Sequence, residues 1–278
     1  MALIDANGVC HMPAEVPARI ACLVPSITEL LFALELDDQL VARTQYCIHP
    51  ADRIKAVPNV GGTKKVKHRL LRRLNPTHVI LNIDENTQPL AEQLADYVPH
   101  IIVTHPNKPL DNLDLYRLFG GIFHRITEAK QLCWQFERAL RELWQTTHDW
   151  PKRKVLYLIW SKPWMSVARG TYIANTLSLV NWETLPPVTA PRYPTLEITP
   201  ALLETVDWVL FSTEPYSFKP LDLHAFADLF GCPGDKLALI DGEMTSWYGN
   251  RAIQGLAYLR HFAEQLEASE GNPHRSSR

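Results

Sequence analysis

The stretch that decides the fold is Ile20-Ala-Cys-Leu-Val-Pro-Ser-Ile-Thr-Glu-Leu-Leu-Phe-Ala33, in which a short apolar run leads at once into a helical pattern. The run 20–24 predicts a buried strand, the first element of the fold, because continuous apolar runs of this length are typical of strands covered on both faces. Pro25 ends the strand. We expect Ser26 to cap a helix over 27–36, in a capping box with Glu29. A strand that leads directly into a helix begins a βαβ unit.

The same alternation of strands and helices continues along the chain. Further strands are predicted over 40–42, 78–82, 101–104, 154–160, 208–212 and 237–240. Between 110 and 147, apolar residues recur every three or four positions, which predicts long amphipathic helix with a break near Gly120-Gly121. We therefore predict an α/β fold: two Rossmann-like α/β lobes, 1–108 and 151–268, joined by a single long backbone helix within 109–150, a ligand cleft between the lobes and a disordered tail over 269–278.

Composition excludes several classes of protein. The chain has 278 residues, 46% of them hydrophobic, and a net charge of −2. A disordered chain is excluded, and a general nucleic-acid binder or a polybasic membrane adaptor is disfavoured. The five cysteines are scattered, which disfavours a disulfide framework or a structural zinc site. No basic region followed by an apolar core opens the sequence, so we expect a cytoplasmic protein as written, and a periplasmic one if a leader preceded it.

The loops that follow the predicted strands carry many aromatic and acidic side chains. Ligand sites of α/β proteins lie beyond the carboxyl ends of strands. Aromatic faces with a few polar groups favour a large flat ligand, although several of these rings also suit the core of a lobe. The side chains in question are Trp160, Trp164, Tyr216, Phe218, Trp247, Tyr248, Asp84, Glu85, Glu214 and Asp241.

Several of these segments resemble one protein family. The matching segments are Arg19–Ala33, Val57-Pro-Asn-Val-Gly-Gly-Thr63, Leu74-Asn-Pro-Thr-His-Val-Ile-Leu81, Arg192-Tyr-Pro194, Ser212-Thr-Glu-Pro-Tyr216 and Asp241-Gly-Glu-Met-Thr-Ser-Trp-Tyr-Gly249. In their order and spacing, from Asp5 to about Leu266, they resemble the substrate-binding proteins of ABC importers that have one helical backbone, closest to the vitamin B12 (cobalamin) and iron-siderophore binders. The resemblance implies a monomeric transport protein that holds a metal chelate, catalyses nothing and has no intrinsic cofactor.

The resemblance also implies ligand contacts. By position they fall on Pro25, Tyr46, Thr63, Trp164, Tyr193, Ser246 and Trp247. The B12 binders have a tryptophan at the position of Thr63, so one wall of a cobalamin site is missing and other iron chelates come into consideration. Ser26, Glu85, Glu214 and Tyr248 join the set because they follow predicted strands.

Cys47 and His49 are candidate axial ligands for cobalt or iron. Alternate residues of an extended segment point the same way, and thiolate and imidazole both bind these metals. The other interpretation is a small buried cysteine and a loop histidine before Pro50. A site for a bare metal ion is disfavoured, because no evident cluster of three or four His and carboxylate ligands occurs.

The expected partners are a small metal chelate and an ABC permease, with no nucleic acid. Relatives that dock on a permease carry one glutamate on each lobe, and the resemblance puts Arg69 and Thr199 at these positions, with Glu197 as a nearby substitute. An arginine facing the arginines of a permease would repel them. The alternative is a cytoplasmic enzyme or chelate-handling protein on the same fold, uncoupled from transport, with Glu85, Glu214 or Cys47 as its reactive groups.

Overall fold

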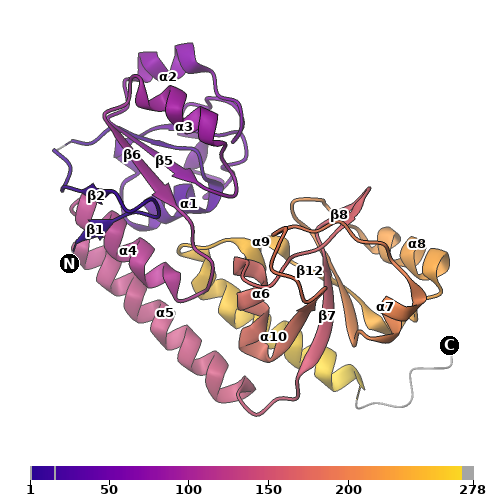
Figure 1. Cartoon of the computed structure of the whole chain (residues 1–278). Helices are drawn as coiled ribbons and strands as arrows, with labels where there is room; N and C mark the ends of the chain where they lie inside the picture. The colour runs from indigo at the N-terminus through magenta and orange to yellow at the C-terminus, as the bar shows by residue number, and fades with distance from the viewer. Residues whose placement is uncertain (1, 16, 271–278) are drawn as a thin grey trace. The chain divides into compact units, whose positions relative to one another are not determined.

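The computed structural model describes residues 2–15 and 17–270, which form two compact units (Figure 1). The first unit comprises Met1–Pro106, Leu110–Phe136 and Tyr248–Arg251. The second comprises Asn107–Pro109, Glu137–Trp247 and Ala252–Arg278. The chain therefore returns to the first unit for a short segment after most of the second has been formed.

A parallel four-stranded sheet forms the centre of the first unit, with the strand order β4-β3-β5-β6. The predicted strands are confirmed here, with small changes at their ends. The core packs apolar side chains of the sheet, such as Ala21 and Val79, against Leu90 and Leu94 of a covering helix. The elements are β3 (Ile20–Cys22), α1 (Pro25–Ala33), η1 (Asp37–Gln39), β4 (Leu40–Arg43), η2 (Ile54–Ala56), α2 (His68–Leu74), β5 (His78–Asn82), α3 (Gln88–Ala95) and β6 (His100–Thr104).

The start of α1 differs from the prediction. The helix begins at Pro25, its N-cap is Val24, and no side chain caps it. Proline suits the first helical turn because it lacks the N–H group that would be unpaired there. The predicted capping box is therefore wrong. Glu29 instead accepts two hydrogen bonds of 2.8 Å from the guanidinium of Arg251, at the start of α10 (Arg251–Glu270).

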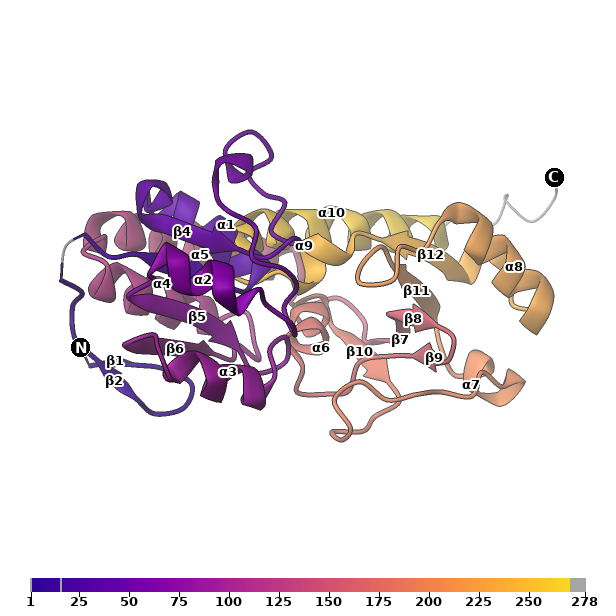
Figure 2. The same cartoon turned by 90° about the horizontal axis from the view of Figure 1, so that it is seen from above.

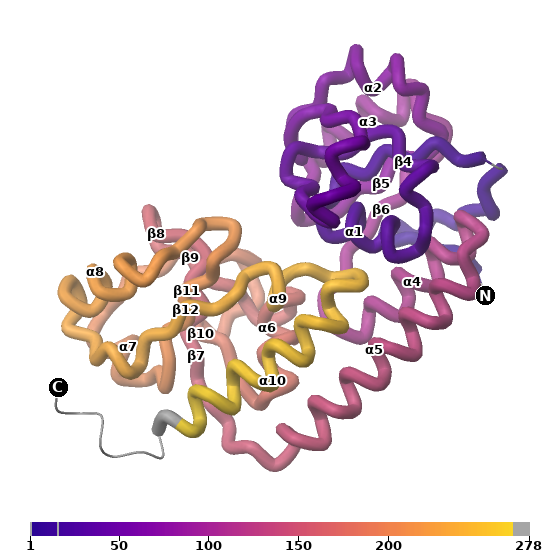
Figure 3. Tube along the Cα trace, turned by 180° about the vertical axis from the view of Figure 1, so that it is seen from behind, coloured from indigo at the N-terminus to yellow at the C-terminus, as the bar shows by residue number. Residues whose placement is uncertain are grey.

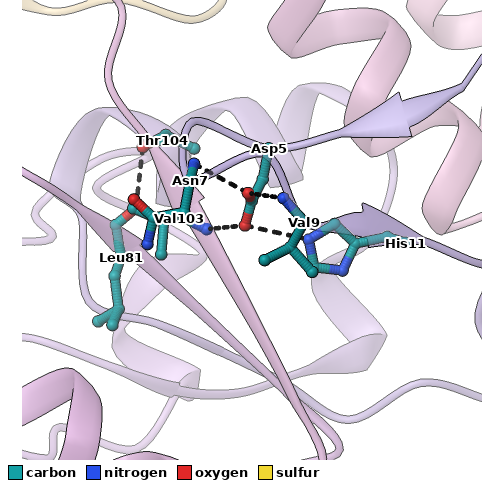
Figure 4. A network of polar contacts seen from close by, with 7 residues as sticks. All are labelled: Asp5, Asn7, Val9, His11, Leu81, Val103 and Thr104. Atoms are coloured by element: carbon teal, nitrogen blue, oxygen red, sulfur yellow. Dashed lines mark hydrogen bonds and ion pairs between the residues drawn. The ribbon is translucent and has the colours of Figure 1, made fainter.

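A short hairpin precedes the strand that was predicted to be the first element. Strands β1 (Leu3–Ile4) and β2 (Cys10–His11) pair in antiparallel fashion. The buried carboxylate of Asp5 fixes the turn: one oxygen accepts the backbone N–H groups of Asn7 and Val9, each at 3.0 Å. The other oxygen lies 3.0 Å from the backbone nitrogen of Val103 in β6 and 3.1 Å from His11 Nε2 (Figure 4). The hairpin therefore covers part of an edge strand of the sheet.

The region between the two sheets is helical, as expected, and the expected break is observed. Helix α4 spans Asp111–Ile122, and α5 runs unbroken from Ile126 to Thr147 (Figure 3). A Cβ atom at Gly120 would lie 2.5 Å from the Cβ of Ala129. Glycine is needed at this position because the two helices approach each other so closely. Helix α5 begins in the first unit and ends in the second.

The second unit repeats the parallel arrangement with the strand order β10-β7-β11-β12 (Figure 2). Its core packs Leu156, Val209 and Phe211 of the sheet against Phe218 and Phe226. Strand β10, the hairpin β8-β9 and helix α9 had not been predicted. The elements are β7 (Arg153–Leu158), β8 (Trp160–Ser161), β9 (Trp164–Met165), α6 (Tyr172–Leu177), η3 (Ser178–Val180), β10 (Trp182–Leu185), α7 (Pro200–Glu204), β11 (Trp208–Ser212), α8 (Pro220–Phe230), η4 (Gly234–Lys236), β12 (Leu237–Ile240) and α9 (Gly242–Ser246).

Two further findings concern membrane-spanning helices and the end of the chain. Over the described residues, no helix has the length and apolar character that a membrane span requires. Of the tail predicted to be disordered, 269–270 belong to the last turn of α10, and 271–278 lie outside the described residues. The domain boundaries and the cleft that the sequence suggested stay predictions.

Candidate functional site

The candidate residues of the first unit gather where its parallel strands end, and we call this region the first carboxyl edge. Ser26 follows β3 at the start of α1, and Glu85 follows β5. Tyr248, from the segment that returns to this unit, donates a hydrogen bond of 2.7 Å to Glu85 Oε1. Burial and the adjacent Glu85 carboxylate raise the pKa of Tyr248 well above its usual value, and the Ser26 hydroxyl opposes this shift. Tyr248 is therefore a neutral donor at physiological pH.

A second cluster at the first carboxyl edge joins two loops. The ring of Tyr46 is exposed, and one of its carbons would lie 3.6 Å from a Cβ atom at Gly62. The neighbouring Thr63 is half-buried, and its carbonyl accepts a hydrogen bond of 2.7 Å from the Asn86 side chain. The structure thus brings Tyr46 and Thr63 onto adjacent loops. Asn86, whose side chain hydrogen-bonds the Thr63 carbonyl, is a residue that sequence reasoning missed.

Cys47 lies in a closed environment. Its thiol is buried and lies 3.1 Å from Thr28 Oγ1 and 3.2 Å from Thr44 Oγ1. Burial raises the pKa of the Cys47 thiol, and the two threonine hydroxyls only partly offset this. A buried neutral thiol is a poor metal ligand, because metals bind the thiolate. His49 is half-buried. The environment of Cys47 matches the small buried cysteine that was the other interpretation of this segment, and axial ligation stays a prediction.

Strand ends of the second unit form the second carboxyl edge. The indole Nε1 of Trp247 donates a hydrogen bond of 2.7 Å to Glu214 Oε2, which joins the segment after α9 to the loop after β11. A Cβ atom at Gly242 would lie 2.5 Å from Ser212 Oγ and 2.7 Å from Glu214 N. Glycine at position 242 therefore permits the close approach of these two segments. The structure brings together Glu214 and Trp247, both of them predicted site residues.

A network of buried hydrogen bonds stabilises the second carboxyl edge. Tyr157 Oη lies 3.0 Å from Ser212 Oγ and 2.7 Å from Thr245 Oγ1. Ser212 in turn donates a hydrogen bond of 2.6 Å to the carbonyl of Glu214. Burial raises the pKa of Tyr157 to about 12, so its hydroxyl stays protonated. Sequence reasoning missed Tyr157 and Thr245, because the apolar run around Tyr157 resembles any buried strand.

The aromatic residues of the second carboxyl edge differ in their exposure. Trp160 is 40% exposed, and its ring meets that of Tyr216 edge to face with centroids 5.4 Å apart. Trp164 is half-buried, stacked parallel to Phe218 and in contact with Phe226 and Phe230. Trp164 therefore belongs in part to the core, as one interpretation of the sequence had it. Trp160 presents more of its surface to solvent, whereas Tyr216 is half-buried and packs against the same core.

The remaining predicted residues have simple placements. Pro25 opens α1 and is buried, whereas Tyr193 and Ser246 are half-buried, in a loop and in the last turn of α9. Arg69 is exposed on α2. The Thr199 side chain accepts a hydrogen bond of 3.2 Å from Leu202 N as the cap of α7, and Glu197 is exposed nearby. Within 2–15 and 17–270, no group of three or more His, Cys, Asp or Glu side chains is arranged to hold a metal ion.

Comparisons with known proteins agree on one family. A family model described as "Periplasmic binding protein" matches residues 20–200. The search of curated protein sequences finds no match. A similar solved structure is the periplasmic vitamin B12 binding protein BtuF of Vibrio cholerae, with 16% sequence identity, a TM-score of 0.78, and coverage of 90% of this chain and 98% of that chain.

Two haem-binding proteins have the same fold. The periplasmic heme-binding protein RhuT from Roseiflexus sp. RS-1 is 19% identical, with a TM-score of 0.74 and coverage of 90% of this chain and 98% of that chain. The periplasmic heme binding protein HutB of Vibrio cholerae is 22% identical, with a TM-score of 0.73 and coverage of 88% and 98%. At these identities the likeness concerns the fold, which is shared over nearly the whole length of each neighbour.

Proposed function

Because the chain belongs to the periplasmic binding protein family, we propose that it binds a metal enclosed in an organic chelate, of the cobalamin, haem or iron-siderophore kind. We propose further that it releases this ligand unchanged, as a substrate-binding protein of an ABC importer does. The observation that carries the proposal is an exposed ring beyond the strand ends of each unit, Tyr46 on the first carboxyl edge and Trp160 on the second. Flat apolar ligands with a few polar substituents bind to such faces.

Polar groups of both carboxyl edges also suit a ligand of this class. Glu85 accepts a hydrogen bond from Tyr248 and Glu214 accepts one from Trp247, and both carboxylates are half-buried. Carboxylates accept hydrogen bonds from amide and hydroxyl groups, which are the donors expected on the rim of a chelate. The names of the similar structures, which include a vitamin B12 binder and heme binders, support this ligand class.

The test is a titration of the protein with three probes: aquocobalamin, hemin and ferric desferrioxamine. Heat and the absorption spectrum of each probe are recorded together. We expect one of the three to bind saturably at 1:1 and to quench tryptophan emission. Trp160→Ala and Tyr46→Ala should each weaken binding of that probe by about tenfold, because a lost aromatic contact is worth on the order of 1 kcal/mol.

The matched control is Trp144→Ala, which removes a tryptophan that is 60% exposed on α5 and follows none of the strand ends. Its affinity for the probe should equal that of the wild type. Saturation with none of the probes would overturn the proposal. A spectral shift that His49→Ala abolishes and Cys47→Ser leaves intact would identify His49 as the axial ligand.

The uncoupled chelate-handling protein is a second candidate, favoured by Arg69. This side chain is exposed on α2 at a position where the resemblance expects a docking glutamate. A chelate-handling enzyme would convert the bound probe, so its spectrum would change over hours and Glu85→Gln or Glu214→Gln would stop the change. A spectrum that stays constant after saturation counts against this candidate. Cell fractionation of the native protein tests whether it resides in the cytoplasm or in the periplasm.

A further inference from the structure

One side of α5 presents an unusual set of side chains to solvent. The buried side of the helix carries Leu132, Phe136 and Leu143. The exposed residues Trp134, Glu137, Arg141 and Trp144 follow one another at intervals of three and four, so they lie along one narrow strip of the helix, and His148 follows directly after its end. We call these five residues the tryptophan stripe. Trp134 and Trp144 are 61% and 60% exposed, which is far more than tryptophan normally is.

A hollow of about 490 Å³ adjoins the second half of the tryptophan stripe. Leu140, Leu143 and Trp144 of α5 line one side of it, and Ser178, Leu179 and Asn181 line the other. The rings of Trp144 and His148 stack with centroids 4.7 Å apart at its rim. The hollow is thus mainly apolar, with aromatic and charged groups around it. All of its lining residues belong to the second unit.

The order of residues in the tryptophan stripe is self-complementary. Trp134 and Trp144 are equally spaced about position 139, and so are Glu137 and Arg141. Two such helices packed antiparallel about a two-fold axis at that level place Trp134 of each copy beside Trp144 of the other. Glu137 of each copy then faces Arg141 of the other. A parallel pairing in register would instead set Glu137 against Glu137, which repels.

We propose that the tryptophan stripe is a self-association surface, and that its occupant is a second copy of this chain bound antiparallel along α5. Trp134 of the second copy fills the hollow beside Trp144. Two Glu137–Arg141 ion pairs between the copies fix the register. A dimer of this kind replaces the monomer that the sequence suggested. The surface is independent of the ligand site proposed above.

The dimer is expected to be weak and salt-sensitive. One helix face buries less area than the standard interface of about 1,600 Å², so association is concentration-dependent. The aromatic pairs provide most of the buried apolar area, and the ion pairs provide register. At the rim of the interface the ion pairs are screened by salt, so raising the ionic strength weakens the dimer.

Sedimentation equilibrium of the full chain over a range of concentrations tests the proposal. We expect a monomer–dimer equilibrium for the wild type. Glu137→Arg sets Arg against Arg in both ion pairs and Arg141→Glu sets Glu against Glu, so each variant should weaken the dimer by about tenfold or more. Trp134→Ala should also weaken it, because the hollow is left unfilled. Circular dichroism verifies that each variant is folded.

Mixing the two single variants is the decisive step. The Glu137→Arg chain carries two arginines at these positions, and the Arg141→Glu chain carries two glutamates. In a mixed dimer both arginines of one chain face both glutamates of the other, so association returns although each variant alone is monomeric. A role of these residues within one chain cannot produce this result. As a control, the exchange Arg138→Glu with Glu142→Arg reverses an ion pair of 2.8 Å on the neighbouring face and should leave association unchanged.

Three outcomes would overturn the proposal. The first is a wild type that stays monomeric up to its solubility limit. The second is a pair of single variants that are folded, dissociated and unable to associate when mixed. The third is association that the Arg138 and Glu142 exchange disrupts as strongly as Glu137→Arg does, which would place the interface on another face of α5.

Discussion

Tyr248 and Glu85 form a hydrogen bond of 2.7 Å although 163 positions separate them in the chain. The contact exists because the chain returns to the first unit for Tyr248–Arg251 after forming most of the second. Gly249 also holds the returning segment: its N donates a hydrogen bond of 2.6 Å to Asn112 Oδ1, and its carbonyl accepts one of 2.8 Å from Tyr116 Oη. The proposed ligand residues of the first carboxyl edge therefore depend on a segment from near the end of the chain.

Tyr248→Phe removes the donor to Glu85 and takes one hydrogen bond from a half-buried carboxylate. We expect the free energy of unfolding to fall by about 1–3 kcal/mol at pH 7, measured by urea denaturation. The folded-state pKa of Tyr248 lies well above 10, so this phenol stabilises the protein fully below pH 10 and progressively less as pH rises further. Tyr248→Phe should therefore lose less stability than the wild type between neutral and strongly alkaline pH.

Tyr216→Phe is the control, because this half-buried tyrosine at the second carboxyl edge interacts through its ring with Trp160 and Phe218. It should change the neutral-pH stability little and leave the alkaline slope as in the wild type. If the free energy of unfolding falls equally with rising alkaline pH in Tyr248→Phe and in the wild type, Tyr248 is not the group responsible for that loss.

The cysteines should differ sharply in their reactivity with a thiol reagent. Cys10 is exposed, whereas Cys22 and Cys47 are buried. Burial raises the pKa of both buried thiols, so little reactive thiolate exists in the folded state. We expect Cys10 to be labelled by a maleimide within minutes, and Cys22 and Cys47 only after denaturant is added. Mass spectrometry of peptides after brief labelling identifies the modified cysteines. Rapid modification of Cys47 in the native protein would contradict this expectation and would favour Cys47 as a metal ligand.

The fold was largely predictable, because the strands of both sheets are apolar runs with clear ends. The predicted run 78–82 and strand β5 coincide, and the broken helical region appears as α4 and α5. Strand β10 escaped notice because its pattern, Trp182-Glu-Thr-Leu185, contains a charge and looks like a loop. The hairpin at the start escaped for a different reason: its stability comes from Asp5, whose partner Val103 is remote in sequence.

The candidate site was less predictable than the fold. Sequence position indicated that Glu85, Glu214 and Trp247 follow strands; the structure agrees for Glu85 and Glu214, whereas the unpredicted helix α9 separates Trp247 from β12. It could not indicate that Trp247 donates to Glu214, because that contact depends on how closely two loops approach at Gly242. The capping box failed for a similar reason. The local pattern at Glu29 was right for a cap, but the guanidinium of Arg251 is a stronger partner and is invisible to local reasoning.

His78 should make the protein sensitive to acid. Its ring is buried and stacks on His100 at a centroid distance of 4.6 Å. Burial, followed by the nearby His100 and His11, lowers the pKa of His78 from 6.5 to about 4. Because the folded-state pKa is the lower one, the unfolded chain takes up this proton first, and stability falls as pH drops from 6.5 to about 4. The loss is on the order of 3 kcal/mol.

His78→Gln should flatten this acid dependence in thermal melts recorded between about pH 7 and pH 4. His224→Gln, at an exposed position of α8, is the matched control and should keep the wild-type dependence. If His78→Gln retains the full acid sensitivity, His78 is not its source.

The ion pair between Arg251 and Glu29 should be a main support of the returning segment. Both side chains are mostly buried, and the pair has two hydrogen bonds of 2.8 Å. Arg251→Met leaves the Glu29 carboxylate buried without its cation, so we expect a loss of about 3–5 kcal/mol in the free energy of unfolding. The double variant Arg251→Met with Glu29→Leu should recover much of that loss, because it removes the uncompensated charge. Arg138→Met breaks the exposed pair with Glu142 and should change the free energy of unfolding little. Denaturation by guanidinium chloride measures all three, and a double variant no more stable than Arg251→Met would mean that packing of the Arg251 side chain, rather than its charge, holds the segment in place.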